Sequence, residues 1–350
     1  MSGPVHEFAR LPGGKQQADM PAARIRGSAD RPDGEPLVGL VYNPRSHRNR
    51  GRDLVEADRP GVLNARPDGR EELPSVMAQF AGAGIELLVI NGGDGTVRDV
   101  LTAALPFYSE NWPAIAVLPK GKTNALNVDL GAPKDWSLLG AIEAFKRGSQ
   151  IIRRPISIEE LGRETGKDDG VVLGFIIGAG GIATGVKAGQ KAHKMGAFNS
   201  LAVGATGAWG VMQALFGNDK NIWRRGVEMD LRLGEERTSL FHSGHGDPKR
   251  RCALLSTTLD QLPMGVKPFG KQKGGVKLAV IDRPRRRLTA ILPLIMTGYS
   301  PKWLAKSGYH QVSTAHYEMD IAEQFILDGE VFPAGSYLIS QGPELSFVVP

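Results

Sequence analysis

The feature that most constrains this chain is a glycine-rich turn, Gly92-Gly93-Asp94-Gly95-Thr96, between an apolar run and an amphipathic segment. Residues 86–90 predict a buried strand, and residues 96–105 carry apolar side chains at helical spacing. Thr96 followed by Asp99 matches a capping box at the start of this helix. Backbone N–H groups at such a glycine-lined helix start can bind phosphate, although the motif alone is equally consistent with a plain tight turn.

The same pattern of strand, turn and helix recurs on both sides of this turn. Residues 37–43 predict a strand that ends at Asn43-Pro44, and residues 114–118 predict another strand before a turn at 119–122. Helices are expected at 123–130 and 137–147. This alternation predicts an open α/β layer over residues 37–150, with ligands bound at the loops that follow the strands.

The rest of the chain does not show this alternation of strands and helices. Residues 1–36 contain no long apolar stretch, so we expect a flexible tail and no secretion signal. From residue 151 to 350, short strand-like runs predict a mostly β domain, with helices near 187–216 and 286–297. The final strand could return to the first domain. No segment predicts a membrane-spanning helix, and the single cysteine, Cys252, fits a reducing, cytoplasmic compartment.

A second candidate phosphate loop lies at residues 116–123. It nearly fits the G-x-x-x-x-G-K-[ST] loop, with Gly121, Lys122 and Thr123 in place. However, Ala116 replaces the first glycine, and Pro119 removes an N–H group that such a loop would use. A true P-loop is therefore disfavoured, while Lys122 could still reach a phosphate as a point charge.

Four motifs together resemble those of one enzyme superfamily. They are Asn43-Pro44-x-Ser46, Gly92-Gly93-Asp94-Gly95-Thr96, Pro119-x-Gly121-x-Thr123-Asn124 and Leu327-Asp328-Gly329-Glu330. In this order they resemble the catalytic domain of diacylglycerol, sphingosine and ceramide kinases, over residues 38–350. The resemblance implies an α/β first domain like that of NAD kinase and phosphofructokinase, a β-sandwich second domain, and an active site in the cleft between them.

The resemblance also implies roles for these residues. An ATP site would be formed by Asn43, Pro44, Ser46, Gly92, Gly93, Asp94, Gly95, Thr96, Gly121, Lys122, Thr123 and Asn124. Asp328 and Glu330 would face the γ-phosphate across the interdomain cleft. Phosphoryl transfer needs a carboxylate to take the hydroxyl proton, and Asp328 is the first choice, with Glu330 close behind. Asp94 is assigned to Mg²⁺ and phosphate, although the base could also be Asp94.

The chain also departs from the family pattern. Many bacterial relatives carry an acidic turn that holds a structural magnesium, whereas residues 271–275 here contain no carboxylate. We therefore expect that metal site to be absent. His47 and its neighbours stand where the family has a glycine after Ser46. Ala125-Leu126 after Asn124 is closer to the sphingosine and ceramide kinase pattern, which tilts the expected substrate toward sphingoid lipids.

Two regions are candidates for contact with lipid. An apolar segment at residues 195–216, with Phe198, Trp209 and Phe216, could line an acyl-chain pocket or form ordinary core. The second is a basic run that could contact anionic lipid. The apolar segment that follows it, up to Trp303, resembles a membrane-interface helix. The basic residues are Lys267, Lys271, Lys273, Lys277, Arg283, Arg285, Arg286 and Arg287.

The sequence leaves three functional hypotheses. The favoured one is an ATP- and Mg²⁺-dependent lipid kinase that is cytoplasmic and bound peripherally to the inner face of the membrane. The alternatives are a kinase of a soluble substrate on the same fold, such as NAD, and a non-enzymatic module that binds nucleotide or nucleic acid. The basic run lacks the interleaved aromatic residues of a nucleic-acid site, so no nucleic-acid partner is expected. The identity of the lipid and the oligomeric state stay open.

Overall fold

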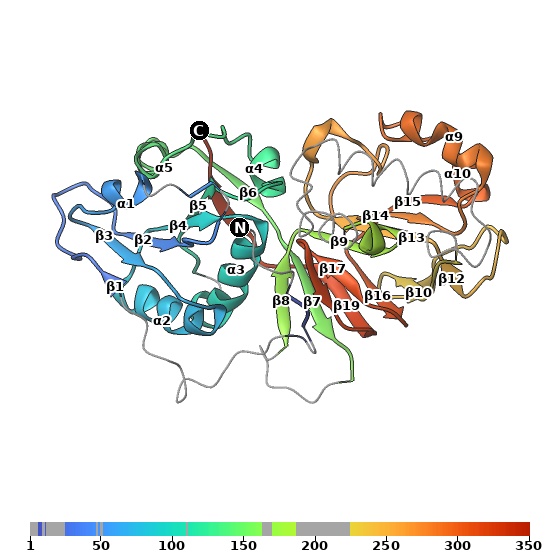
Figure 1. The fold of residues 1–350 in the computed structure, drawn as a ribbon, viewed down its shortest axis with the longest axis horizontal. Coiled ribbons are helices and arrows are strands. Elements are labelled where there is room, and N and C mark those ends of the chain that lie inside the picture. The colour runs from blue at the N-terminus through green and yellow to red at the C-terminus, as the bar shows by residue number, and fades with distance from the viewer. Residues whose placement is uncertain are drawn as a thin grey trace.

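The computed structural model describes residues 6–8, 11, 25–46, 48–49, 52–109, 111–162, 170–186 and 225–350, which form two lobes side by side (Figure 1). The first lobe is built on a seven-stranded sheet in the order β1-β3-β2-β4-β5-β20-β6. Its five inner strands run parallel, and the two edge strands are antiparallel to their neighbours. The strands are β1 (Ile25–Arg26), β2 (Val38–Tyr42), β3 (Val62–Ala65), β4 (Leu87–Gly92), β5 (Ala114–Pro119), β6 (Gln150–Arg153) and β20 (Leu345–Val348).

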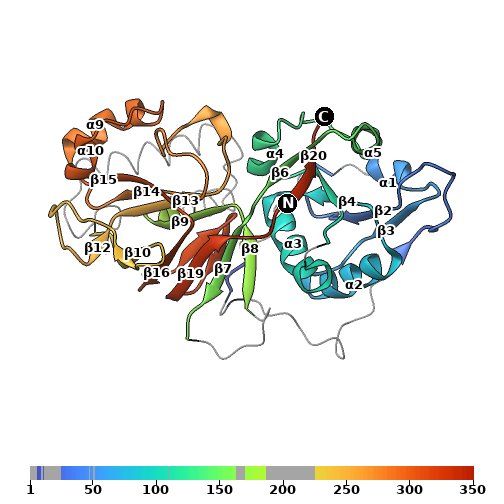
Figure 2. The same ribbon diagram turned by 180° about the vertical axis from the view of Figure 1, so that it is seen from behind.

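Helices cover both faces of this sheet (Figure 2). They are α1 (Arg52–Glu56), α2 (Leu73–Ala83), α3 (Asp94–Tyr108), α4 (Ala125–Asp129) and α5 (Leu138–Lys146), with a short 3₁₀ helix η2 (Arg70–Glu72) before α2. On one face Phe80 of α2 and Val97 of α3 join the core, and on the other face Ile142 of α5 does. Every residue of β2, β4 and β5 is buried, as expected for parallel strands covered on two sides.

The sheet register brings three loops to one edge. Tyr42 at the end of β2 pairs with Asn91, and Gly92 at the end of β4 pairs with Pro119 at the end of β5. Parallel strands that end in register send their following loops out together. The turns after β2, β4 and β5 are therefore neighbours, and this edge is where ligands bind in open α/β sheets.

The second lobe consists of two antiparallel sheets. One has the order β11-β10-β16-β19-β7-β8, with β12 paired to β10, and the other has the order β15-β14-β13-β9-β17-β18. The first contains β7 (Ile156–Glu160), β8 (Val171–Gly174), β10 (Val227–Leu233), β11 (Thr238–Ser239), β12 (Arg250–Arg251), β16 (His316–Ile321) and β19 (Gly335–Gln341). The second contains β9 (Ile176–Gly180), β13 (Ala253–Thr257), β14 (Val276–Ile281), β15 (Tyr309–Thr314), β17 (Phe325–Leu327) and β18 (Glu330–Phe332).

Both sheets contribute to one core, in which Tyr317 and Tyr337 of the first sheet and Phe325 of the second are fully buried. Buried and more exposed residues alternate along β10 and β16, as expected for strands with one face in the core. A helical layer covers the outer face of β14 and β15 with a separate apolar cluster. It consists of η3 (Pro263–Gly265), α9 (Arg286–Ile295) and α10 (Trp303–Lys306).

The lobes are held together by hydrogen bonds between specific elements. The Thr102 hydroxyl on α3 accepts the Leu173 N–H of β8 at 3.1 Å. Asp129 of α4 accepts the N–H groups of Asp260 and Gln261 at 2.7 and 2.6 Å. A buried carboxylate that accepts two N–H groups is a directional link, so these contacts fix the second lobe against α3 and α4.

Several expectations differ from the structure or lie outside it. Strand β6 still belongs to the first sheet, so the chain leaves the first lobe after Arg153 and not at residue 150. The final strand, β20, does return to the first lobe, where it lies between β5 and β6. Within the tail predicted to be flexible, Phe8 and Leu11 are buried and β1 pairs with β3. The helix predicted at 195–216, with Phe198, Trp209 and Phe216, lies outside the described residues. Among the residues described, no helix has the length and apolarity to cross a bilayer.

Candidate active site at the junction of the lobes

The turns after β4 and β5 touch through two glycines. A Cβ atom on Gly93 would lie 2.8 Å from the Gly121 Cα atom, and one on Gly121 would lie 2.6 Å from the Gly93 Cα atom. These distances require both residues to lack a side chain. Around Gly95, in the first turn of α3, a Cβ atom would meet nothing closer than 3.8 Å. The start of α3 therefore offers N–H groups without side chains in the way, as phosphate binding needs.

The predicted capping box is wrong. Helix α3 begins at Asp94 with Gly93 as its N-cap, and the glycine has no side chain to cap it. The Thr96 hydroxyl instead accepts a hydrogen bond from Asn43 Nδ2 at 2.8 Å. This bond ties the turn after β2 to the turn after β4.

The turn after β2 is organised around Asn43. Its side-chain oxygen accepts the Arg45 N–H at 3.0 Å, and its main-chain oxygen accepts the Ser46 N–H at 3.2 Å. Pro44 is exposed and Ser46 is half-buried. The structure thus brings Asn43, Pro44 and Ser46 beside the glycine turn, with Asn43 as the structural link.

The turn after β5 is held by Asn124. This residue has a positive φ of 50°, and its side chain both accepts the Gly121 N–H at 2.7 Å and donates to the Gly121 carbonyl at 3.0 Å. Lys122 and Thr123 are exposed at the tip of the turn. Because the Gly121 N–H is already bonded and Ala116 lies inside β5, this turn is not a P-loop.

The Asp-Gly-Glu motif forms the hairpin turn between β17 and β18. Asp328 and Gly329 have positive φ values of 47° and 86°, and Leu327 pairs with Glu330, as in a two-residue type I′ turn. The interpretation as a β-turn and the interpretation as a site motif are therefore both compatible with the structure.

The turn places Asp328 close to Asp94 of the other lobe. The Asp328 carboxylate accepts the Phe175 N–H at 3.0 Å and the Ile176 N–H at 2.9 Å, just after β8. Burial and the negative charge of Asp94 raise the pKa of Asp328 to about 7, against the opposing effect of Arg98. Burial also raises the pKa of Asp94, which accepts the Leu126 N–H at 3.4 Å. The two lobes thus bring these two carboxyls together.

Glu330 faces the start of α3. A Cβ atom on Gly95 would lie 3.9 Å from Glu330 Oε1. Burial raises the pKa of Glu330, and the positive charges of Arg98 and Arg70 oppose this rise. The glycine turn and these acids are more than 230 positions apart in the sequence. The fold brings them next to each other.

Arg98 is a site residue that the sequence did not reveal. Its side chain is 1% exposed, donates to the Leu327 carbonyl at 3.0 Å and pairs with Asp99 at 2.7 Å. Its charge also acts on Asp328 and Glu330. Only its position four residues after Asp94 could have signalled this, because residues four apart share one side of a helix.

A polar network behind the glycine turns was also missed. Asn91, at the end of β4, donates to Asp53 Oδ2 at 2.6 Å. Lys120, directly after β5, lies 2.8 Å from the same Asp53 oxygen. These side chains join the ends of β4 and β5 to α1, and Lys120 rather than Lys122 is the lysine held in the site.

The arrangement suits phosphate chemistry. It offers a helix start free of side chains, a carboxyl of raised pKa near neutrality, and a buried guanidinium beside it. Over the described part of the chain, no group of three or more His, Cys, Asp or Glu side chains is arranged to hold a metal ion by itself.

The predicted basic surface needs one correction. Lys277 is 3% exposed and pairs with Asp260 at 3.0 Å, so it is not part of the surface. Asp282 is the only acidic residue between positions 261 and 308, and it is buried. The exposed basic residues in this stretch are Lys267, Lys271, Lys273, Arg285, Arg286, Arg287, Lys302 and Lys306.

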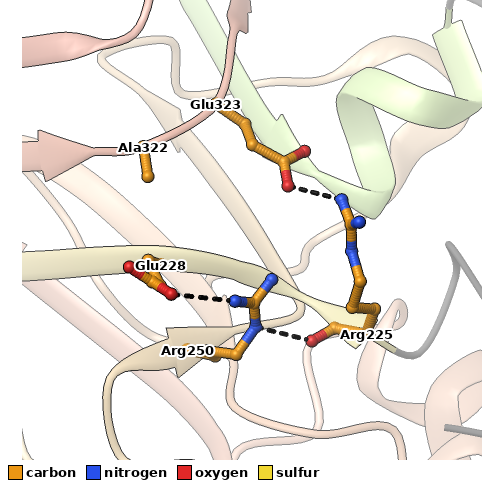
Figure 3. Close-up of a pocket in the computed structure, with 5 residues that line it drawn as sticks. All are labelled: Arg225, Glu228, Arg250, Ala322 and Glu323. Carbon is orange, nitrogen blue, oxygen red and sulfur yellow. Dashed lines mark hydrogen bonds and ion pairs between the residues drawn. The ribbon is translucent and has the colours of Figure 1, made fainter. Parts of the chain in front are cut away.

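A pocket of about 520 Å³ lies in the second lobe, lined by Arg225, Glu228, Arg250, Ala322 and Glu323 (Figure 3). Each arginine is paired with a carboxylate there. Arg225 lies 2.5 Å from Glu323, and Arg250 lies 3.1 Å from Glu228. Because these charges are already compensated, the pocket does not compete with the junction as a phosphate site.

Comparison with known proteins gives sequence matches that lie mainly in the first lobe. Residues 38–153 match the diacylglycerol kinase catalytic domain family. A diacylglycerol kinase from Bacillus subtilis (strain 168) is 27% identical over 133 residues, which cover 35% of this chain and 41% of that protein. A probable lipid kinase YegS-like from Chromohalobacter salexigens is 38% identical over 80 residues, 23% of this chain and 24% of that protein. The matches thus span less than half the length of either relative.

The fold is also shared with a solved structure. The crystal structure of a diacylglycerol kinase from Bacillus anthracis str. Sterne superposes with a TM-score of 0.58 at 13% identity, covering 90% of this chain and 97% of that one. The family match contains the turns after β2, β4 and β5 that form one side of the candidate site. Residues 38–153, which form most of the first lobe, thus carry a domain of the diacylglycerol kinase catalytic family.

Proposed function

We propose that this chain is an ATP-dependent lipid kinase that transfers the γ-phosphate to the hydroxyl of diacylglycerol or of a ceramide or sphingoid lipid. The observation that carries the proposal is the approach of Glu330 and Asp328 in one lobe to the glycine turn and Asp94 in the other. The match of residues 38–153 to the diacylglycerol kinase catalytic domain family supports it. On this proposal the first lobe is the NAD kinase-like layer, the second lobe is the sandwich, and the junction is the active-site cleft.

The proposed ATP site is the edge formed by the three turns. The start of α3 fits phosphate groups because Gly93 and Gly95 leave its N–H groups accessible. Asn43, through its bond to Thr96, holds the turn after β2 in place, and Asn124 does so for the turn after β5. Lys122 and Thr123, at the exposed tip, are proposed to contact the outer phosphates.

In the proposed transfer, Asp328 takes the proton of the lipid hydroxyl. The hydroxyl oxygen forms a bond to the γ-phosphorus, the bond to the bridging oxygen of ATP breaks, and ADP leaves with that electron pair. A base works best when its pKa is close to the working pH, and the Asp328 pKa of about 7 meets this condition. Glu330 and Asp94 stay candidates for the same proton.

The carboxyls also fit a nucleotide-bound magnesium ion. The Asp94 carboxyl accepts N–H groups at the start of α4, and burial disfavours its charged form. A cation beside it would remove that penalty. When bound with ATP, Mg²⁺ supplies charge neutralisation of the phosphates. Asp94 is its proposed ligand.

The helical layer of the second lobe is the proposed contact with the membrane. Residues 261–308, which contain this layer and the loops that connect it, carry the eight exposed basic residues named above together with exposed Met264, Leu294, Tyr299 and Trp303. Exposed cations without exposed acids attract anionic headgroups, and aromatic tips favour the interface. The proposed location is accordingly the cytoplasmic face of a membrane. Binding to vesicles of anionic and neutral lipid tests this: salt should weaken it, and binding to neutral vesicles with equal strength would contradict it.

The deciding experiment is a substrate panel. The chain is incubated with ATP, Mg²⁺ and one acceptor at a time, namely diacylglycerol, ceramide, sphingosine or NAD, and the phosphorylated product is identified by mass. A phosphorylated lipid is expected, and the Asp328→Asn variant should give none. Phosphorylated NAD would favour the soluble-substrate kinase. A gel-shift of nucleic acid together with no product would favour the non-enzymatic alternative.

A further inference from the structure

Residues 6–8, which belong to the tail predicted to be flexible, lie against β18 in the candidate site. Glu7 forms a parallel bridge with Val331 of β18. The Phe8 N–H donates to the Val331 carbonyl at 2.8 Å, and the Val331 N–H donates to the His6 carbonyl at 3.1 Å. Because β18 is an edge strand of its sheet, this segment extends the sheet by one short strand.

The segment reaches Glu330 directly. The His6 main-chain N–H donates a hydrogen bond to Glu330 Oε2. The other oxygen, Oε1, is the atom that lies next to Gly95 at the start of α3. One side of this carboxylate is therefore held by the N-terminal segment while the other faces the proposed phosphate site.

Phe8 anchors the segment. Its side chain is 8% exposed and stacks on Phe332 of β18 with ring centroids 4.6 Å apart. The Arg70 guanidinium lies 4.7 Å from the centre of the Phe8 ring, and that of Arg98 lies 5.6 Å from it. Phe8 thus packs against the arginine that acts on both catalytic candidates, and it helps to keep that guanidinium away from water.

We propose that residues 6–8 are a positioning element of the active site, which docks on β18 and holds the Glu330 carboxylate so that Oε1 points to the start of α3. This inference rests on the proposed kinase function. The contacts favour positioning over inhibition, because the segment bonds to Oε2 and leaves the Oε1 side open. On this proposal the position of the Glu330 side chain and the docking of residues 6–8 are coupled, so a substitution that weakens one weakens the other.

Two substitutions at one position isolate the main-chain donor in the full-length chain. His6→Pro removes the N–H group that bonds to Glu330, whereas His6→Ala keeps it. Because a hydrogen bond to a charged group is lost, we expect kcat of His6→Pro to be about tenfold below that of His6→Ala. The KM for ATP should stay within about twofold, since the three turns of the first lobe are untouched. Equal kcat values, or a higher value for His6→Pro, would overturn the proposal.

Hydrogen exchange supplies a measurement that does not depend on activity. Phe8→Ala should remove the anchor and accelerate exchange of the Val331 amide, which bonds to the His6 carbonyl. Glu330→Ala should in turn accelerate exchange of the Phe8 amide. Unchanged protection in both variants would show that the segment and Glu330 are not coupled. If no acceptor is phosphorylated by the unmodified chain, the proposed function fails, while the exchange rates still decide whether the segment holds Glu330.

Discussion

The two lobes contribute to the candidate site in different ways. The first lobe supplies main-chain groups, presented by glycines that approach each other too closely for any side chain. The second lobe supplies ionisable side chains on a two-residue hairpin turn, and the pKa values of those side chains depend on residues of the first lobe. Binding geometry can thus be set within one lobe, whereas the proton chemistry exists only when both lobes are assembled.

The largest expected effect concerns the second lobe. Asp328→Asn should lower kcat about 10³-fold or more, because the variant cannot accept a proton, while the KM for ATP changes little. Steady-state kinetics with the best lipid acceptor measures this. Asp320→Asn is a matched control on β16, outside the junction. Normal turnover of Asp328→Asn would remove this residue from the role of base and leave Glu330 or Asp94.

The same substitution has a stability signature with a defined sign. The pKa of Asp328 rises from its ordinary value of 3.8 to about 7 on folding, so the folded chain holds a proton that the unfolded chain has lost. Folding stability therefore falls as the pH rises from about 4 to 7. Asp328→Asn removes this dependence, so its melting temperature relative to wild type should be higher at pH 8 than at pH 5. The opposite order would contradict the raised pKa of the buried Asp328 carboxyl.

Arg98 tests whether the second lobe depends on the first. Arg98→Gln keeps donor groups but loses the charge that lowers the pKa of Asp328, so that pKa should rise above about 7. The rate rises with pH as the base loses its proton, so this limb of the pH–rate profile should move to higher pH. We expect kcat at pH 7 to fall about tenfold and to recover in part at pH 9.

Arg251→Gln is the control for Arg98. Arg251 is also a buried arginine, 4% exposed, but it pairs with Asp282 in the second lobe. It should cost stability without moving the pH–rate profile. If the pH–rate profile of Arg98→Gln were unchanged, Arg98 would contribute to folding stability only and would not set the pKa of Asp328.

The contrast between the lobes also explains what the sequence could reveal. The glycine turn, its strand and its helix are adjacent in the chain, so local pattern was enough to predict a glycine-rich turn between a strand and a helix, although α3 begins at Asp94, two residues before the predicted start. The capping box failed because Thr96 lies inside the first turn of α3, whose N-cap is Gly93, and its hydroxyl accepts a hydrogen bond from Asn43, which is 53 positions away. Rules based on local sequence pair a hydroxyl with a nearby backbone group, so they do not include a partner such as Asn43 that is distant in the chain.

Side chains whose partners come from other segments of the chain could not be assigned from local sequence pattern. In the sequence Arg98 is an ordinary charged residue of a helix, and only the fold places the Leu327 carbonyl, Asp328 and Glu330 near it. Lys277 was counted with an exposed basic run because its partner, Asp260, is brought to it by folding. Even the position of β20 between β5 and β6 depends on pairing across almost the whole chain.

The glycine contact of the first lobe can be tested by stability. Gly93→Ala places a Cβ atom 2.8 Å from the Gly121 Cα atom, and a backbone neighbour cannot move aside cheaply. We expect a loss of about 1–3 kcal/mol in the free energy of unfolding. Gly82→Ala in α2, whose Cβ atom would meet nothing within 4 Å, should instead stabilise the chain by about 1 kcal/mol. Denaturant unfolding of both variants measures the difference, and equal effects would contradict the close approach.

The smallest expected effect distinguishes two lysines of the turn after β5. Lys122 is exposed at its tip, so Lys122→Ala should raise the KM for ATP by no more than about threefold, because an exposed charge is screened by water. Lys120→Ala should instead destabilise the fold by about 3 kcal/mol, because it removes the cation 2.8 Å from buried Asp53. A P-loop would reverse this order for catalysis, since its lysine contacts the transferred phosphate. Loss of turnover in Lys122→Ala with normal stability would therefore restore the P-loop interpretation and place a side chain of the first lobe, beside its main-chain groups, in the transfer step.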